Sequence, residues 1–371
     1  MRTPMRVLVV GVSRFSMPSG LCRYTDVLCR SLAGIDGVEV TVAVGAWQRN
    51  YFRDVFKTHL HSRVMSIDID NSSLSRNAWY TMKLPRISSE LKADIVHFAY
   101  PVPFLRKFHC PTAVTVHDLY PFEIPTNFRF AEANKAFLKY SVRRCDAVVC
   151  VSQTTLKTLT HFVPDVANKR VLSQIYTPVA IPETTADQQP LQGLQPRRFL
   201  LTVGQHRDNK NLDLLQRTFV TLRTTLRVPA DWKLVIVGSE GPKTAELRAL
   251  TAELGLTDHV IYLSSIGESE LAWLYQNAAV AAFPSSHEGF CLPLAESLSS
   301  GLRVVCSNIP TLKEIGRDSC TYFQLESEPV EALASAISNA ISGPAPVPAS
   351  SSYFRAEYAA SQMLQVYQAL T

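Results

Sequence analysis

One stretch of the chain decides the fold: Phe283-Pro284-Ser285-Ser286-His287-Glu288-Gly289-Phe290-Cys291-Leu292-Pro293-Leu294-Ala295-Glu296. It starts at the end of an apolar, strand-like run over 279–283 and crosses a turn at 284–286. The pattern then predicts a helix that begins at Pro293, where the missing N–H of proline costs nothing. That helix should end at Gly301, because glycine favours the position after a helix C-terminus.

The backbone amides of residues 289–292 therefore lie where a helix N-terminus can receive an anion. Two carboxylates, Glu288 and Glu296, flank these amides. A carboxylate repels phosphate but accepts hydrogen bonds from sugar and ribose hydroxyls. The arrangement fits a nucleotide-sugar. The alternative is that Glu296 is an ordinary first-turn acid on the helix dipole and Glu288 an ordinary exposed loop residue.

Length and composition predict two domains of an ordinary soluble globular protein, with no apolar run near the ~20 residues of a membrane span. The N-terminal residues 1–12 are typical of a first strand rather than of a signal peptide. None of the eight cysteines lies in a Cys-x-x-Cys pair. Reduced thiols of a cytoplasmic protein are therefore expected, rather than disulfides or a zinc site.

The charge is unevenly distributed along the chain. Residues 1–180 carry 23 Lys and Arg against 13 Asp and Glu, whereas the remainder carries 14 against 19. A basic first half suggests an anionic partner, such as a phospholipid surface or a pyrophosphate-linked acceptor, and the alternative is a solvated surface with no partner. Nucleic acid is not expected, because the basic residues form no patch interleaved with aromatic residues.

Short apolar runs alternate with helical patterns in both halves, which predicts an α/β fold with two doubly wound parallel sheets. Strands are expected over 6–10, 38–44, 94–98, 112–117, 146–151, 199–203, 233–237, 260–263, 279–283 and 303–307. Helices are expected over 21–33 and 131–144, and an amphipathic one over 353–370. Pro, Gln, Thr and Gly gather over 178–198 and predict an interdomain linker, and 343–352 reads as a loop. The expected domains are 1–180 and 181–352, followed by a terminal helix over 353–371 that can pack back on the first domain.

Three loops at expected strand ends carry candidate site residues. Loop 11–20 has no G-x-G-x-x-G pattern, which disfavours a nicotinamide site, but Gly20 can approach a phosphate or form an ordinary turn. His117 ends a strand and can contact a substrate hydroxyl or phosphate, or be a satisfied structural histidine. In loop 204–211, Arg207 and Lys210 can aim positive charge at a diphosphate or remain solvated cations.

The sequence resembles the family 4 retaining glycosyltransferases, which have the GT-B fold of two facing Rossmann-like domains. The resemblance spans nearly the whole chain, and its most specific element is the E-x7-E motif from Glu288 to Glu296. It is supported by segments 19–24, 115–119, 145–152, 204–211 and 301–316. Two departures concern the donor site: Cys291 replaces the usual Gly, and Asn209 stands where many relatives carry Arg.

The resemblance implies roles for individual residues. His117, Lys210 and Glu288 would be catalytic, with Lys210 on the diphosphate and Glu288 on hydroxyls of the donor sugar. The implied donor-binding residues are Gly20, Gly204, Arg207, Lys210, Gly289, Phe290, Cys291, Leu292 and Glu296. No metal is expected, and Asp68-Ile69-Asp70 is read as incidental because it lies away from the donor motifs.

The activity implied is transfer of a hexosyl group, with mannosyl as the first guess, from a nucleoside-diphosphate sugar to a hydroxyl of a glycan or lipid-linked saccharide. The anomeric configuration would be kept and no cofactor would be needed. GDP-mannose is the first expected donor and a UDP-sugar the second. The pattern most resembles bacterial mannosyltransferases. On its charge alone, the basic first half would then face the inner leaflet of the cell membrane and a lipid-linked acceptor, so a cytoplasmic place at that face is expected. A GT-B nucleotide-sugar epimerase and a catalytically silent nucleotide-sugar binder are the alternatives.

Overall fold

The computed structural model describes residues 4–15, 19–53, 55–56, 61–123, 131–180, 191, 193–343 and 352–371. The chain divides into two compact units, unit 1 (Met1–Val179 with Ser352–Thr371) and unit 2 (Ala180–Ser351). Residues 181–190 of the expected linker and 344–351 of the expected last loop lie outside the described residues. Each unit is therefore described by itself.

Unit 1 is built on a seven-stranded sheet in which every pairing is parallel, in the order β3-β2-β1-β4-β5-β6-β7. Its strands are β1 Met5–Val10, β2 Val38–Gly45, β3 Arg63–Ile67, β4 Ile95–Phe98, β5 Thr112–Val116, β6 Ala147–Cys150 and β7 Val171–Gln174. Its helices are α1 Gly20–Ala33, α2 Arg49–Phe52, α3 Ser73–Ala78, α4 Leu84–Glu90, α5 Tyr120–Glu123, α6 Ala131–Arg144, α7 Gln153–Phe162 and α14 Ala356–Gln368. A π-helical segment, Trp79–Lys83, joins α3 to α4.

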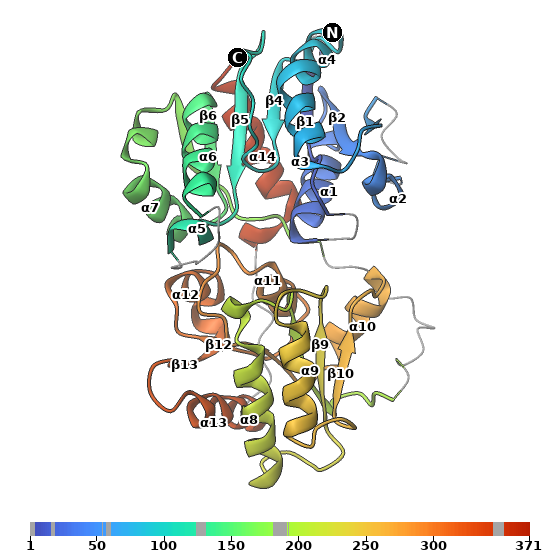
Figure 1. Ribbon diagram of the computed structural model, residues 1–371, viewed down its shortest axis with the longest axis vertical. Helices are drawn as coiled ribbons and strands as arrows, with labels where there is room; N and C mark the ends of the chain where they lie inside the picture. Colours follow the sequence, from blue (N-terminus) through green and yellow to red (C-terminus); the bar gives the residue numbers. More distant parts are fainter. Residues whose placement is uncertain are drawn as a thin grey trace. The chain divides into compact units, whose positions relative to one another are not determined.

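Both faces of the unit 1 sheet are covered by helices, as its nearly continuous apolar strands predict. Successive residues of a strand point to opposite faces, so Val7 and Val9 pack with α1 and α14, whereas Leu8 and Val10 pack with α4, α6 and α7. Figure 1 shows this layering, with α14 (red) lying along α1 (blue).

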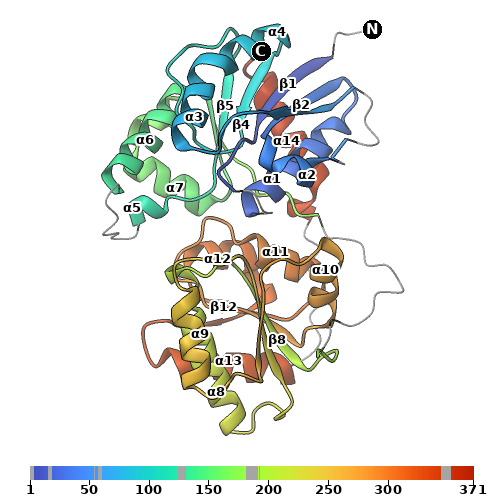
Figure 2. The same ribbon diagram turned by 45° about the vertical axis from the view of Figure 1, so that its right-hand side comes forward.

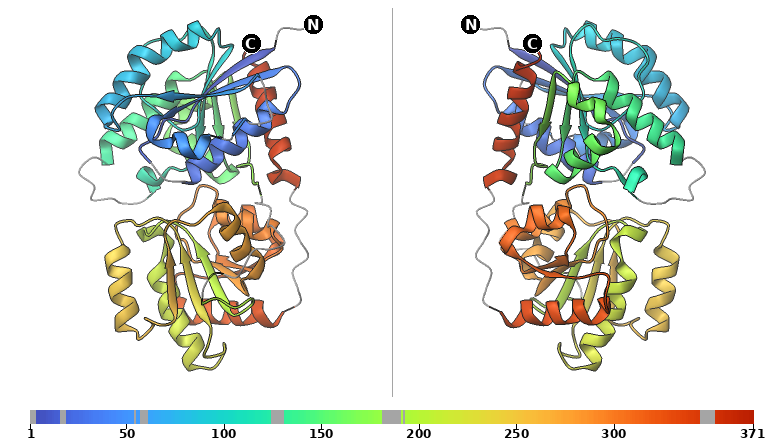
Figure 3. Two further views of the ribbon diagram at one scale, coloured as in Figure 1. Left: turned by 90° about the vertical axis from the view of Figure 1, so that its right-hand side faces the viewer. Right: turned by 90° about the vertical axis from the view of Figure 1, so that its left-hand side faces the viewer.

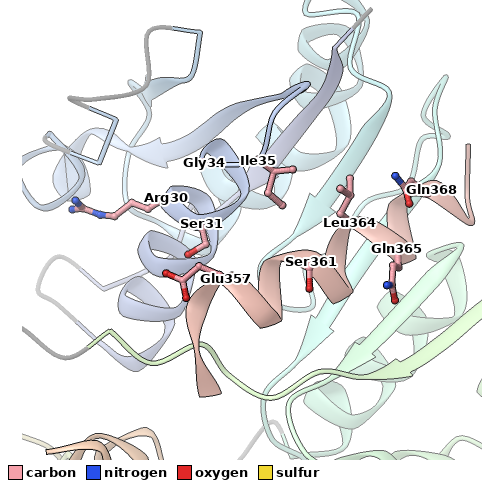
Figure 4. Close-up of a pocket in the computed structure, with 9 residues that line it drawn as sticks. All are labelled: Arg30, Ser31, Gly34, Ile35, Glu357, Ser361, Leu364, Gln365 and Gln368. Atoms are coloured by element: carbon pink, nitrogen blue, oxygen red, sulfur yellow. The ribbon is translucent and has the colours of Figure 1, made fainter. Parts of the chain in front are cut away.

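The last helix completes unit 1. Met363, Val366 and Tyr367 of α14 are buried in its core, as the amphipathic pattern predicts. The backbone N–H of Val179 donates to the carbonyl of Phe354 at 2.8 Å, and Val179 forms a parallel bridge with Arg355. Unit 1 therefore receives the returning chain beside the point where the chain leaves it. A groove of about 630 Å³ remains between the outer sides of α1 and α14 (Figure 4).

Unit 2 repeats the architecture with six parallel strands in the order β10-β9-β8-β11-β12-β13. Its strands are β8 Phe199–Val203, β9 Lys233–Val237, β10 Val260–Leu263, β11 Val280–Phe283, β12 Val304–Ser307 and β13 Cys320–Phe323. Its helices are α8 Leu212–Thr224, α9 Thr244–Glu253, α10 Glu268–Asn277, α11 Leu292–Ser299, α12 Pro310–Gly316 and α13 Pro329–Ser342. Figures 2 and 3 show helices on both sides of this sheet, and α8 and α13 pack together on one face.

The ten expected strands all form, with ends shifted by one residue at most. Three strands were not predicted, namely β3, β7 and β13. Each is an edge strand with partly exposed residues, so its sequence lacks the continuous apolar run of a strand covered on both faces. Among the described residues, no helix has both the length and the apolar character that crossing a membrane requires.

Candidate active site

The candidate active site of unit 2 lies where its strand order reverses. From β8 the chain builds outward through β9 to β10, and it then returns to place β11 on the other side of β8. Open α/β sheets bind ligands at the carboxyl ends of such neighbouring strands, because their loops diverge there and leave a crevice. The loops that follow β8 and β11 are residues 204–211 and 284–291, the two segments singled out from the sequence.

Lys210 and Glu288 meet at this point. The ammonium of Lys210 lies 2.5 Å from Oε1 of Glu288, and the hydroxyl of Ser285 donates to the same oxygen at 2.7 Å. The aliphatic stem of Lys210 lies over Gly204, where an added Cβ would come within 3.3 Å of Cε. The hydroxyl of Thr311 donates to the backbone carbonyl of Glu288 at 2.7 Å. Both charged side chains are thus held in fixed positions by their neighbours.

The carboxylate of Glu288 affects the protonation of both Lys210 and Cys291. Burial disfavours the ammonium form of Lys210, but the negative charge of Glu288 and its hydrogen bond outweigh burial and raise the lysine pKa above its ordinary value. Burial also raises the pKa of the Cys291 thiol well above its ordinary value, and Glu288 acts in the same direction. Lys210 is therefore a fixed cation and Cys291 a neutral thiol at physiological pH.

Two asparagines tie the two loops together. Nδ2 of Asn209 donates to the carbonyl of His287 at 2.9 Å, and Nδ2 of Asn211 donates to the carbonyl of Pro284 at 2.8 Å. The backbone of Asn211 is left-handed, with φ of 45°, a conformation that asparagine tolerates better than most residues. Asn209, the residue that departs from the family pattern, therefore fixes the loop that carries Glu288.

The helix that follows the second loop starts as predicted, within one residue. α11 spans Leu292–Ser299 with a proline in its first turn. Cys291 precedes it with φ of 68° and ψ of 67°, a left-handed conformation. Glycine adopts this conformation without strain, which explains physically why the family favours glycine here. In the first turn of α11, Pro293 has no N–H, and the amides of Leu294 and Ala295 donate to the carbonyl of Cys291. The helix can therefore act on an anion chiefly through its dipole.

Glu296 lies on the buried face of α11 rather than on its solvent-exposed face. Only 2% of the residue is exposed, and the hydroxyl of Tyr275 on α10 donates to its Oε2 at 2.7 Å. This burial distinguishes Glu296 from an ordinary solvated acid, because a buried carboxylate needs hydrogen-bond partners.

The other predicted donor residues lie on the same loops but differ in exposure. Arg207 is half-buried, and its charge acts to lower the pKa of Lys210, which places the two cations near each other. Gly289 and Phe290 are buried, and Leu292 is half-buried as the first residue of α11. These residues share one end of the unit 2 sheet.

The remaining two predicted residues belong to unit 1. Gly20 is the exposed first residue of α1, and Ser19 caps that helix by accepting from the amide of Cys22. His117 directly follows β5, where its Nε2 lies 2.8 Å from the carbonyl of Ala99. Burial lowers the pKa of His117 below its ordinary value. The histidine is thus neutral, with its Nε2–H donating to Ala99 and Nδ1 left as an acceptor.

A pocket of about 200 Å³ lies at the corresponding strand reversal of unit 1, beside the ends of β1 and β4. Aromatic and cationic side chains line it, among them Arg14, Phe15, Arg76, Tyr80, Tyr100 and Phe137. Tyr80 and Tyr100 are both fixed by their hydroxyls, which donate to the carbonyl of Val12. The pocket therefore offers flat apolar surfaces beside hydrogen-bond donors.

Sequence reasoning missed several residues that shape the site. Ser285, Tyr275 and Thr311 hold the two glutamates, and their types carry no signal without the fold. Asn209 and Asn211 flank Lys210, so their polar side chains in an interior loop were a usable signal. The described residues contain no group of three or more His, Cys, Asp or Glu side chains placed to hold a metal ion.

Two models of known families match adjacent parts of the chain. Residues 18–174 match Glycosyltransferase Family 4 and residues 184–358 match Glycosyl transferases group 1. The chain belongs to the family 4, group 1 glycosyltransferases. In this family member, the Glycosyltransferase Family 4 match covers most of unit 1. The Glycosyl transferases group 1 match covers most of unit 2, which carries Lys210 and Glu288.

Curated relatives of this family member include three bacterial mannosyltransferases. The chain is 28% identical to the O-antigen chain mannosyltransferase RfbU of Salmonella typhimurium, over 62% of this chain and 60% of the relative. It is 26% identical to the O-antigen chain mannosyltransferase B of Escherichia coli, over 65% of each chain. It is 29% identical to the GDP-mannose:cellobiosyl-diphosphopolyprenol alpha-mannosyltransferase of Xanthomonas oryzae, over 50% of this chain and 52% of the relative. The chain thus spans less than two thirds of the length of each of these relatives.

Solved structures resemble this family member along nearly its whole length. HepE of Anabaena, crystallised with UDP and glucose, gives a TM-score of 0.73 at 16% identity over 99% of this chain and 100% of that chain. Sucrose-phosphate synthase of Thermosynechococcus elongatus gives 0.72 at 18% identity over 98% of each chain. At this identity the likeness concerns the fold, and the predicted GT-B class with two Rossmann-like domains is confirmed.

Proposed function

We propose that this protein is a retaining hexosyltransferase that moves a sugar from a nucleoside-diphosphate donor to a hydroxyl of a glycan or lipid-linked saccharide. The observation that carries the proposal is the buried pair of Lys210 and Glu288 at the strand reversal of unit 2. A fixed cation beside a fixed carboxylate suits a ligand that carries both a diphosphate and sugar hydroxyls. The family membership of the chain supports the same reaction class.

The chemistry assigned to the residues follows from their charges. Departure of the nucleoside diphosphate develops negative charge, and the permanent ammonium of Lys210 stabilises it where the leaving oxygens emerge. Arg207 and the dipole of α11 at its N-terminus add positive potential on the same side. Glu288 accepts hydrogen bonds from the donor sugar, and Glu296 accepts them from the nucleotide ribose. The acceptor hydroxyl attacks from the face that the diphosphate leaves and passes its proton to the departing phosphate oxygen, which keeps the anomeric configuration without a metal or a cofactor.

Mannose is the first proposed sugar and GDP the first proposed nucleotide. Three relatives are mannosyltransferases by name, and the name of one of them gives GDP-mannose as its donor. A UDP-sugar is the second proposal, since HepE was crystallised with UDP-glucose as well as with UDP and glucose. His117 would accept a hydrogen bond from the donor sugar through its Nδ1.

The acceptor and the place of action are proposed from unit 1. The aromatic pocket beside β1 and β4 offers stacking surface for a sugar ring and cations for an attached phosphate. Residues 73–86, which contribute Arg76 and Tyr80 to this pocket, also carry the exposed apolar side chains of Leu74 and Met82, with 81% and 57% of their surface exposed. The same segment carries the exposed cations Lys83 and Arg86. Apolar side chains among cations suit peripheral contact with an anionic membrane. All eight cysteines are free thiols, which favours the reducing cytoplasm and hence the inner face of the membrane.

The proposal is tested by incubating the protein with GDP-mannose, UDP-glucose, UDP-galactose and UDP-N-acetylglucosamine, each with and without a polyprenyl-diphosphate saccharide. We expect nucleoside diphosphate release from one donor only when the acceptor is present, together with an α-linked product from an α-linked donor. A changed sugar nucleotide without transfer would instead indicate an epimerase. Saturable binding without turnover of any donor would indicate a silent binder, and either result would overturn the proposal.

A further inference from the structure

A chain of buried polar side chains runs through unit 1 from the last helix to His117. The hydroxyl of Tyr367 on α14 lies 2.5 Å from Nδ1 of His97 on β4. Nε2 of His97 lies 2.8 Å from Oγ1 of Thr115 on β5, and the hydroxyl of Tyr24 on α1 lies 2.8 Å from that same Oγ1. The ring of Tyr24 then packs edge-on against the imidazole of His117, with ring centroids 4.5 Å apart at 84°.

The positions of the protons in this chain follow from burial. Tyr24, Thr115, His97 and Tyr367 are each exposed by 2% or less. Burial lowers the pKa of His97 to about 3, so its ring is neutral and carries a single N–H. The hydroxyl of Tyr367 has only His97 as a partner among the described residues, so it donates to Nδ1. The N–H of His97 is then on Nε2 and donates to Thr115.

His117 is held by the same two strands that carry the chain. Its Nε2–H donates to the carbonyl of Ala99. Ala99 directly follows β4 and lies two residues after His97. Thr115 precedes His117 by two residues on β5. The ring of Tyr24 fixes the tilt of the imidazole from a third element, α1. Linked hydrogen bonds in a low-dielectric interior rigidify the side chains that they join, so the loss of one bond affects the others in the chain.

We infer that Tyr24, Thr115, His97 and Tyr367 are positioning residues for His117, and that through them the C-terminal helix holds the free Nδ1 in its catalytic orientation. The inference rests on the proposed function, because it takes His117 to meet the donor sugar. It gives α14 a role in the chemistry beyond covering the core of unit 1. It also predicts that the tautomer of His117 depends on a hydroxyl that is 250 residues away in the sequence.

The test breaks the chain at three places, with Tyr367→Phe, Thr115→Val and Tyr24→Phe, each of which removes a hydroxyl and keeps the bulk of the side chain. In ¹⁵N-edited NMR spectra without substrate, wild-type His117 should show a single tautomer with the proton on Nε2. We expect the three variants to show averaged His117 nitrogen shifts, assigned by their loss in His117→Gln. With the donor, kcat should fall about 5- to 10-fold, the size expected for one lost hydrogen bond, while the donor KM stays within about twofold.

Two controls and one rescue separate positioning from general destabilisation. Gln365→Ala alters an exposed side chain of α14 that lines the outer groove (Figure 4), and Tyr140→Phe removes a hydroxyl from α6 that donates to the carbonyl of Phe104. Both should leave the His117 signals and kcat unchanged. Thr115→Ser keeps the hydroxyl and should restore both readouts that Thr115→Val loses.

Unchanged His117 shifts in Thr115→Val and Tyr367→Phe would overturn the inference, as would equal losses of kcat in the two controls. The NMR readout requires no substrate. If no nucleotide-sugar is turned over, the proposed function fails while the His117 signals still report on the positioning chain.

Discussion

The ammonium of Lys210 and the carboxylate of Glu288, which are 78 residues apart in the sequence, form an ion pair of 2.5 Å with side-chain exposures of only 19% and 9%. A pair this buried is sensitive to the loss of one member, because the other then remains as an uncompensated charge. A donor diphosphate that binds Lys210 would face the same carboxylate. The pair therefore couples stability and activity in ways that single and double variants can separate.

Replacing Lys210 alone should lower both the stability and the activity of the protein. We expect Lys210→Met to lower the free energy of unfolding by about 3–5 kcal/mol, since Glu288 is left unpaired. It should lower kcat/KM for the donor by about 10³-fold or more, because the charge on the leaving diphosphate is no longer neutralised. Urea denaturation and donor kinetics measure the two effects. The double variant Lys210→Met with Glu288→Gln should recover most of the stability and none of the activity; recovery of neither would contradict the pair's assigned structural role.

Ser285 offers a milder change at the same carboxylate. Ser285→Ala removes the hydrogen bond to Oε1 of Glu288 and leaves the ion pair in place. The expected loss of kcat/KM is about 5- to 10-fold, the equivalent of about 1–1.5 kcal/mol. Ser286→Ala is the matched control, because the hydroxyl of Ser286 bonds the ring of His287 and, among the described residues, no other group. Equal losses in both variants would show that the loop, rather than Glu288, responds to the change.

The left-handed backbone of Cys291 predicts an order of stabilities. Cys291→Gly relieves the strain of a side chain at φ of 68° but loosens the unfolded chain, so its free energy of unfolding should stay within about 1 kcal/mol of wild type. Cys291→Val places a β-branched residue in this conformation and should lose more than about 2 kcal/mol. Chemical denaturation measures the series. A valine variant as stable as the glycine variant would mean that the backbone at 291 adjusts readily.

The neutral state of His97 predicts acid sensitivity. Its pKa in the folded protein, about 3, lies below the ordinary value of 6.5, so protons bind the unfolded chain more readily. The stability that this gives is complete above pH 6.5 and is lost as the pH falls toward 3, by up to ~1.4 kcal/mol per pH unit. The wild-type free energy of unfolding should therefore fall more steeply between pH 6.5 and 4 than that of His97→Gln. Parallel slopes in urea titrations of the two proteins would count against a neutral buried His97.

The central strands of both sheets and the position of Lys210 after β8 were accessible from the sequence because they depend on local signals. Apolar runs mark the central strands, and a cation at a helix start opposes the helix dipole, which makes it noticeable. The edge strand β7 carries only partly buried residues and gives no such signal. Tyr24 and Tyr367 look like ordinary core residues in the sequence, and only the fold places them on one hydrogen-bonded chain with His97.

The hydrogen bond from Val179 to Phe354 has a consequence for how the protein is made. Because unit 2 is inserted between two parts of unit 1, a ribosome finishes the whole of unit 2 before it releases α14. The domain that is begun first is therefore completed last, reversing the usual N-terminal-first order of folding during synthesis. Until residues 352–371 emerge, the apolar face that α14 later covers stays open, so a nascent chain truncated before them should depend on chaperones.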